Sequence, residues 1–128
     1  MKIQLTIQGS SIRGIESLYE EINRVFMKEE DWLLGNSLDA LDDLLYGGFG
    51  AAKGATQVEI TWQDIDISKA ALGHDETRQY YLDKLQPGSP FNKALFSEKL
   101  QALENGNGQT YFDLVMDVFS SHANIVIK

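Results

Sequence analysis

Three short apolar segments, spaced far apart along the chain, place the strongest constraint on its fold. Residues 3–7 and 57–62 alternate apolar and polar side chains, as strands with one buried face do, and residues 125–127 are all β-branched. Segments with helical periodicity separate each pair. Strands joined through helices run parallel, and their crossovers are right-handed. The spacing therefore predicts an α/β fold with a small three-stranded parallel sheet, and it leaves the strand order open.

Helical patterns fill the gaps between the three strands. The predicted helices cover residues 14–28, 37–46, 64–72, 75–85, 90–104 and 111–119. For the fifth of these, Ser89 can act as the N-cap with Pro90 at the first helical position. The element order is then β-α-α-β-α-(α-α)-α-β. With 128 residues we expect one domain over residues 1–128.

The second predicted helix has clear start and stop signals. Asn36 or Ser37 can cap its N-terminus by accepting a backbone hydrogen bond, and Gly47 can end it in the left-handed conformation. Helical spacing gathers its leucines into one apolar stripe, formed by Leu38, Leu41 and Leu45. The same spacing gathers three carboxylates on another face, those of Asp39, Asp42 and Asp43. With no Lys or Arg nearby in sequence, this face is either a solvated surface or a surface that binds cations.

Acidic residues are concentrated around this helix. The net charge is −8, and residues 29–52 hold six Asp or Glu and no Lys or Arg. The remaining residues hold 13 acids and 11 bases, so 24 residues carry −6 of the total. A field of this sign repels nucleic acids and anionic membranes, and it speeds the encounter with cationic partners. We therefore expect a cationic protein partner, no nucleic acid and no membrane.

The sequence lacks the constellations of an enzyme or a metal site. Cysteine is absent, and His74 and His122 stand far apart without metal-ligand spacing. The Gly-rich segment 105–108 lacks the lysine of a phosphate-binding loop. Asp39 and Asp43 could act as acid and base or hold a divalent cation, but both stay ionised on a surface helix, and calcium ligands normally come from loops. We expect no enzymatic activity, no cofactor and no metal.

The chain also gives expectations about where it works. Its N-terminal residues alternate instead of forming the apolar core of a signal peptide. No apolar run is long enough to span a bilayer. Together with the absence of cysteine, these features predict a cytoplasmic protein, which we expect to be monomeric when free.

The segment from Gly35 to Leu45 resembles the signature of the barstar family, intracellular inhibitors of secreted ribonucleases. Residues 38–43 read Leu-Asp-Ala-Leu-Asp-Asp, and the family pattern is Gly-x-Asn-Leu-Asp-Ala-Leu-Trp-Asp. The resemblance extends to residues 7–18, to Val58–Trp62 with Ser68-Lys69, and to the C-terminal segment. It covers residues 3–72 and 104–128. Residues 73–104 are therefore expected to be a helical insertion.

The resemblance implies a barstar-like fold and a binding mechanism. In the family, this helix and the loop before it plug the active site of a ribonuclease, where carboxylates take the place of substrate phosphates. Asp39 and Asp43 match the two key acids of the family. The expected partner-binding residues are Asp39, Asp42, Asp43, Ser37, Leu33, Leu34, Tyr46 and Gly47.

Several positions depart from the family pattern. The asparagine of the signature is Ser37 and its tryptophan is Asp42, while the paired aromatics before the glycine are Leu33 and Leu34. Aromatic anchors often carry much of the binding energy of an interface. These differences predict a target other than barnase, either a cationic ribonuclease or a ribonuclease-like toxin paired with this chain as its immunity protein. The alternative is a barstar-like regulatory module that binds a different protein through the insertion.

Overall fold

The computed structural model describes all residues, 1–128, and contains a three-stranded parallel sheet in the order β1-β2-β3. The strands are β1 (Lys2–Gln8), β2 (Gln57–Gln63) and β3 (Ile125–Ile127). The central strand β2 pairs in parallel along all of β1, and over three residues with β3. The predicted α/β fold with a small parallel sheet is confirmed, and the structure adds the strand order.

Six α-helices connect the strands in the predicted order. They are α1 (Ile15–Phe26), α2 (Leu38–Leu45), α3 (Ile65–Ala71), α4 (His74–Lys84), α5 (Lys93–Glu104) and α6 (Tyr111–Ser120), with a short 3₁₀ turn, η1 (Gly9–Ser11), after β1. None of the six helices combines the length and the apolar character that a membrane span requires.

The predicted start of α5 is wrong. The cap is Asn92, whose side chain accepts a hydrogen bond from the backbone of Leu95 at 3.1 Å. Ser89 instead accepts a hydrogen bond from the backbone of Phe91 at 3.2 Å, in a local turn. Both Ser and Asn are good caps, and the turn at Ser89 leaves the second of them to begin the helix.

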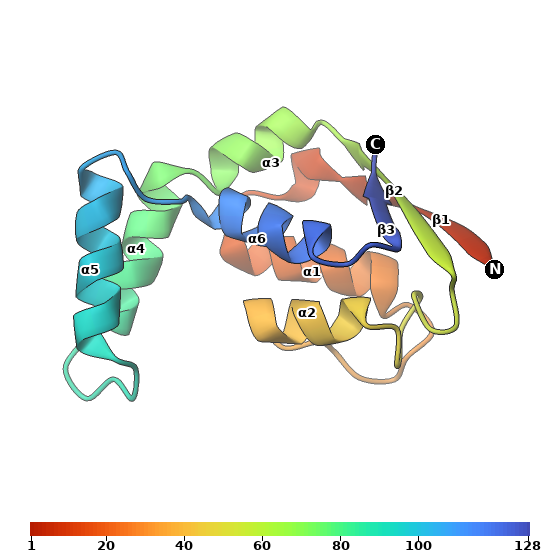
Figure 1. The fold of residues 1–128 in the computed structure, drawn as a ribbon, viewed down its shortest axis with the longest axis horizontal. Coiled ribbons are helices and arrows are strands. Elements are labelled where there is room, and N and C mark those ends of the chain that lie inside the picture. The colour runs from red at the N-terminus through yellow and green to blue at the C-terminus, as the bar shows by residue number, and fades with distance from the viewer.

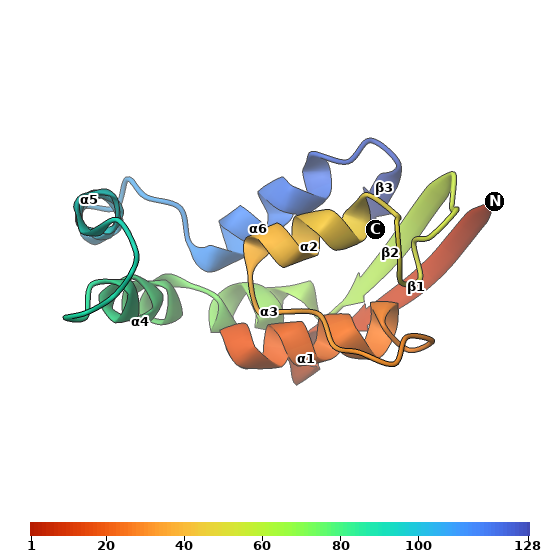
Figure 2. The same cartoon turned by 90° about the horizontal axis from the view of Figure 1, so that it is seen from below.

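The hydrophobic core lies between the sheet and three of the helices. Figures 1 and 2 show α1, α2 and α6 on the same side of the sheet. The strand residues that point toward these helices are apolar and include Ile7, Val58, Ile60 and Trp62, all of them buried. The alternating pattern of the sequence therefore reflects a sheet that is covered on one face only.

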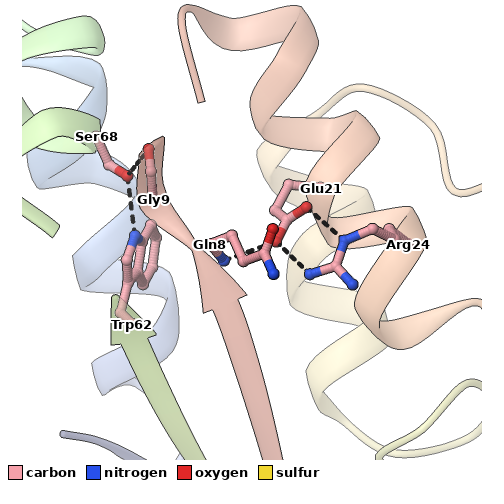
Figure 3. Close-up of polar contacts among 6 residues, drawn as sticks. All are labelled: Gln8, Gly9, Glu21, Arg24, Trp62 and Ser68. Carbon is pink, nitrogen blue, oxygen red and sulfur yellow. Dashed lines mark hydrogen bonds and ion pairs between the residues drawn. The ribbon is translucent and has the colours of Figure 1, made fainter. Parts of the chain in front are cut away.

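A polar network joins the ends of β1 and β2 to α3 (Figure 3). The Ser68 hydroxyl accepts a hydrogen bond from the Trp62 indole at 2.9 Å and donates one to the carbonyl of Gly9 at 3.0 Å. A Cβ on Gly9 would lie 2.3 Å from the carbonyl oxygen of Gln63, so only glycine fits there. Three residues that carry the family resemblance in the sequence, Gly9, Trp62 and Ser68, thus meet at one junction.

The second half of this network holds α1 against the edge of the sheet. The Glu21 carboxylate accepts a hydrogen bond from the backbone of Gln8 at 2.7 Å, and Arg24 binds it with two nitrogens at 2.6 and 2.7 Å (Figure 3). Burial acts to raise the pKa of Glu21, but hydrogen bonds from the Arg24 guanidinium and the Gln8 backbone together outweigh it, so the pKa is lowered.

The two helices of the predicted insertion are attached to the rest of the protein unequally. On α4, the Glu76 carboxylate accepts a hydrogen bond from the first residue of α1, and the Thr77 hydroxyl accepts one from the first residue of α6, both at 2.7 Å. By contrast, α5 packs mainly on α4, with an ion pair between Arg78 and Glu104 at 2.6 Å. Figure 1 shows α5 at the end of the molecule away from the sheet.

The uncovered face of the sheet carries one buried charge. The Glu59 carboxylate, on the central strand, is bracketed by the ammonium groups of Lys128 at 2.8 Å and Lys2 at 2.9 Å. Hydrogen bonds from Lys128 and then from Lys2 lower the pKa of Glu59 to about 2. This carboxylate therefore links β2 to β1 and to the residue that follows β3 through charge-assisted contacts.

Replacing Glu59 with glutamine should lower the free energy of unfolding in a pH-dependent way. Because the pKa of Glu59 is lower in the folded chain than in the unfolded chain, its stabilising effect is complete above about pH 5 and disappears as the pH falls toward 2. Urea denaturation should show a large difference in the free energy of unfolding between Glu59→Gln and wild type at pH 7 and a clearly smaller one at pH 3, where the folded chain still holds Glu59 ionised but the unfolded chain does not. As a control, Glu98→Gln removes an exposed acid that forms no ion pair, and its free energy of unfolding should match that of wild type at both pH values. If Glu59→Gln lowered the free energy of unfolding by the same amount at pH 3 and pH 7, the low pKa of Glu59 would be contradicted.

Candidate functional site

Both ends of the acidic helix α2 are fixed by the residues that the sequence singles out. The Ser37 hydroxyl accepts a hydrogen bond from the backbone of Ala40 at 3.0 Å, so Ser37 is the N-cap of the two candidates. Gly47 follows the helix with φ +85°, and a Cβ there would also lie 3.1 Å from the carbonyl oxygen of Ala52. The predicted cap and stop signal are confirmed.

The apolar face of α2 differs from the predicted stripe. Leu41, Leu44 and Leu45 are fully buried, whereas Leu38 is only partly buried. The helix packs on α6, and Leu44 joins Leu41 and Leu45 in the core, while Leu38 is partly buried against it. Leu38 also lines a cavity between α2 and the α4–α5 segment. The sequence periodicity allowed either leucine, and the long-range packing of α2 on α6 decided between them.

The three carboxylates of α2 have different surroundings. Asp42 accepts a hydrogen bond from the Nε2 of His122 at 2.6 Å, because a carboxylate has no proton to donate. Asp39 and Asp43 are exposed and take part in no ion pair. No Lys or Arg lies near this face in the sequence, and the structure adds His122 as a hydrogen-bond partner of Asp42. His122 lies 80 residues away in the sequence, so no local pattern could indicate the contact.

His122 also supports the aromatic residue at the end of α2. The ring is buried in the turn between α6 and β3, and Tyr46 packs edge-on against it with the centroids 4.7 Å apart. The side chain of Tyr46 is 74% exposed. One histidine thus fixes both an acidic and an aromatic side chain at the C-terminal end of α2.

The loop before α2 places its two leucines on opposite sides. Leu33 is 77% exposed, as expected for a residue that contacts a partner, but Leu34 is only 4% exposed. The side chain of Asn23 on α1 holds Leu34 in place, accepting a hydrogen bond from its backbone N–H at 2.7 Å and donating one to its carbonyl at 3.4 Å. The expectation that Leu34 is exposed is therefore wrong, because this backbone clamp turns its side chain into the core.

The loop before α2 also holds an exposed aromatic residue, Trp32, that the predicted site does not include. Trp32 is 45% exposed and packs against Phe49, which follows α2, with the ring centroids 4.9 Å apart. The apolar loop sequence before the helix was the signal for Trp32, but nothing in the sequence indicates its contact with Phe49. Leu33, Trp32 and Tyr46 give the acidic helix an apolar rim.

Two of the six acidic side chains in residues 29–52 form hydrogen bonds within the protein. The Glu30 carboxylate accepts a hydrogen bond from the backbone of Gly50 at 2.7 Å, which ties the loop before α2 to the segment after it, and Asp42 binds His122. The others remain exposed: Glu29, Asp31, Asp39 and Asp43. We call Asp39 and Asp43, with the rim of Leu33, Trp32 and Tyr46, the acidic face.

The fold and the acidic face define a small α/β protein whose surface helix is anchored in the core and carries negative charge. The family model described as Barstar (barnase inhibitor) matches residues 3–87, more than half of the chain. The chain therefore belongs to the barstar family. Comparisons with curated proteins and with solved structures found no match.

The family match includes the sheet strands β1 and β2, the acidic face and all of α4. It ends at residue 87, inside the predicted insertion at residues 73–104. That boundary agrees with the structure, in which α4 is attached to α1 and α6 while α5 packs mainly on α4. The bounds of the insertion, and a single domain over residues 1–128, stay predictions.

Substituting the acids of α2 one at a time should separate their roles. Asp42→Ala should lower the free energy of unfolding by about 1 kcal/mol, because it leaves a buried imidazole without its hydrogen-bond partner. Asp43→Ala should change it by less than about 0.5 kcal/mol, because it removes repulsion from Asp39 one turn away. Urea denaturation at pH 7 measures both values, and the two variants are matched in net charge. Equal losses of stability would show that the contact with His122 contributes nothing to the fold.

Proposed function

We propose that this chain inhibits a cationic ribonuclease or ribonuclease-like toxin, and that α2 and the loop before it cover the active site of that enzyme. The observation that carries the proposal is the pair of exposed carboxylates on Asp39 and Asp43, one helical turn apart, without an internal cation. The other side of the same helix is buried through Leu41, Leu44 and Leu45. This protein has no enzymatic role in the proposal.

Substrate chemistry explains why such a pair suits a ribonuclease. An enzyme that binds RNA must place cationic side chains where the phosphates lie. Two carboxylates on a rigid helix offer the same sign of charge, and they form charge-assisted hydrogen bonds with arginine and lysine. The concentrated negative field of residues 29–52 also accelerates the approach of a cationic protein.

The predicted site residues then divide into contacting and supporting groups. Asp39, Asp43, Leu33 and Tyr46 contact the target, and Trp32 joins them. Ser37, Gly47, Leu34 and Asp42 hold the helix and its loop in position, through the cap, the turn, the buried side chain and the contact with His122. Because the face is fixed before the target arrives, little conformational entropy is lost on binding.

The altered positions of the family signature support a target other than barnase. Asp42 stands where the family has tryptophan, and its carboxylate is directed to His122. The exposed aromatics next to α2 are Trp32, in the loop before it, and Tyr46, directly after its last residue. We infer a toxin–immunity pair in which this chain protects the cytoplasm of the cell that makes the enzyme.

The proposal is tested by measuring inhibition of RNA cleavage against a panel of small basic microbial ribonucleases, with barnase included. The wild-type chain should inhibit at least one of them, and barnase weakly or not at all. The double variant Asp39→Ala, Asp43→Ala should lose about 100-fold or more in affinity, because each charged hydrogen bond contributes about 1.5 to 3 kcal/mol.

The matched control is the double variant Asp66→Ala, Glu98→Ala, which removes two exposed helical acids elsewhere and changes the net charge equally. It should inhibit as the wild type does. If Asp39→Ala, Asp43→Ala also inhibits like wild type, the acidic face is not the binding site. If no ribonuclease is inhibited, and a captured partner is lost only when α5 is altered, the regulatory-module alternative replaces this proposal.

A further inference from the structure

We propose that α4 and the segment leading into α5 form a second wall of the partner-binding site, and that the cavity between this wall and the first turn of α2 receives an arginine side chain of the partner protein. The inference rests on the proposed function in one respect only, which is that the partner is the cationic protein bound by the acidic face. It assigns a binding role to residues that the family resemblance treats as an insertion.

The cavity has about 270 Å³ and joins two parts of the chain that are distant in sequence. One wall is the first turn of α2, with Ser37, Leu38 and Asp39. The opposite wall comes from α4, α5 and the segment between them, and it presents Tyr80, Lys84, Phe91 and Phe96. An acid therefore faces three aromatic rings across a space large enough for a side chain.

The aromatic wall already holds a cation of the chain itself. The Lys84 ammonium lies 3.7 Å from the centroid of the Phe91 ring and 5.0 Å from that of Tyr80. Aromatic rings attract cations through the negative charge of their faces. Lys84 forms no ion pair with a carboxylate, so the rings are its main partners. The ring faces of this wall thus already bind a positive group, and an incoming cation must displace Lys84 from them.

The Asp39 carboxylate, on the opposite wall, influences the aromatic residues across the cavity. Burial raises the pKa of Tyr80, and the negative charge of Asp39 raises it further. The phenol therefore stays protonated and remains a hydrogen-bond donor toward the cavity. Asp39 itself has no cationic partner within the protein.

Arginine is the partner group that satisfies both walls at once. Its planar guanidinium can stack on an aromatic ring while two of its nitrogens bind one carboxylate, which the compact ammonium of lysine cannot do. The negative field around α2 rejects acidic groups and favours this cation. On binding, the arginine replaces Lys84 over the rings, and the lysine side chain moves into solvent.

The aromatic wall is held in place before any partner arrives. Tyr80 packs edge-on against the buried Tyr111 of α6, with the centroids 5.0 Å apart. The ring of Phe96 lies 6.1 Å from that of Tyr81, which is buried under α5, and 5.9 Å from that of Phe91. Phe91 is 45% exposed, so it can be truncated without opening the core.

The test uses N-acetyl-L-arginine methylamide as the probe and the full chain labelled with ¹⁵N. Titration at low ionic strength should give saturable chemical-shift changes at the amides of residues 38–40 and in α4. N-acetyl-L-citrulline methylamide, which is nearly the same shape without the charge, should bind at least about tenfold more weakly, because charged contacts contribute more than neutral ones.

Four variants place the probe in the cavity. Phe91→Ala and Asp39→Asn should each weaken binding about fivefold, because they remove a ring and the carboxylate. Lys84→Gln should tighten it by about threefold, because the competing ammonium is gone. Leu95→Ala, which truncates an exposed apolar residue of α5 that does not line the cavity, is the matched control and should bind like wild type.

Two results would overturn the inference. One is binding that Phe91→Ala leaves unchanged, with shifts spread over Asp31 and Asp43, since that pattern indicates general attraction to negative charge. The other is weaker binding by Lys84→Gln, since Lys84 would then assist the ligand. Inhibition assays separate the two proposals. If wild type, Phe91→Ala and Lys84→Gln inhibit a ribonuclease equally, the cavity is not part of the binding site. If the chain binds the arginine probe but inhibits no ribonuclease, only the proposed function is contradicted.

Discussion

Parallel pairing of three successive strands is the constraint on which the rest of this structure depends. Each strand must be followed by a helical crossover of the same hand, so the crossovers cover the same face of the sheet. α2 lies in the first crossover and α6 closes the second, and the two helices become neighbours on that face. Their contact brings His122 to Asp42. The support of α2 is therefore a product of the topology, although the residues of the acidic face lie close together in the sequence.

Local interactions explain which parts of this arrangement the sequence predicted. Alternation marked the strands because one face of the sheet is covered and the other is not. Ser37 and Gly47 marked the ends of α2 because capping and left-handed turns depend on neighbouring residues. The same local reasoning failed at Ser89, where two adequate caps competed and a turn decided between them.

Long-range contacts account for what the sequence could not predict. Leu34 and Leu33 are neighbours of equal hydrophobicity, and only the clamp from Asn23 turns one inward and leaves the other exposed. Asp42 and Asp43 are likewise indistinguishable by periodicity, yet one binds a histidine 80 residues away and the other faces solvent. In both cases a partner from another element assigns different roles to adjacent, similar side chains.

The unequal attachment of α4 and α5 has a consequence for how this protein can evolve. Because α5 packs mainly on α4, most substitutions on its outer surface leave the core and the sheet unchanged. Selection can therefore alter that surface at little cost in folding stability, while the junction at Gly9, Trp62 and Ser68 tolerates almost no change. A chain built on this plan can vary the outer surface of its peripheral helix while the scaffold beneath the sheet junction stays the same.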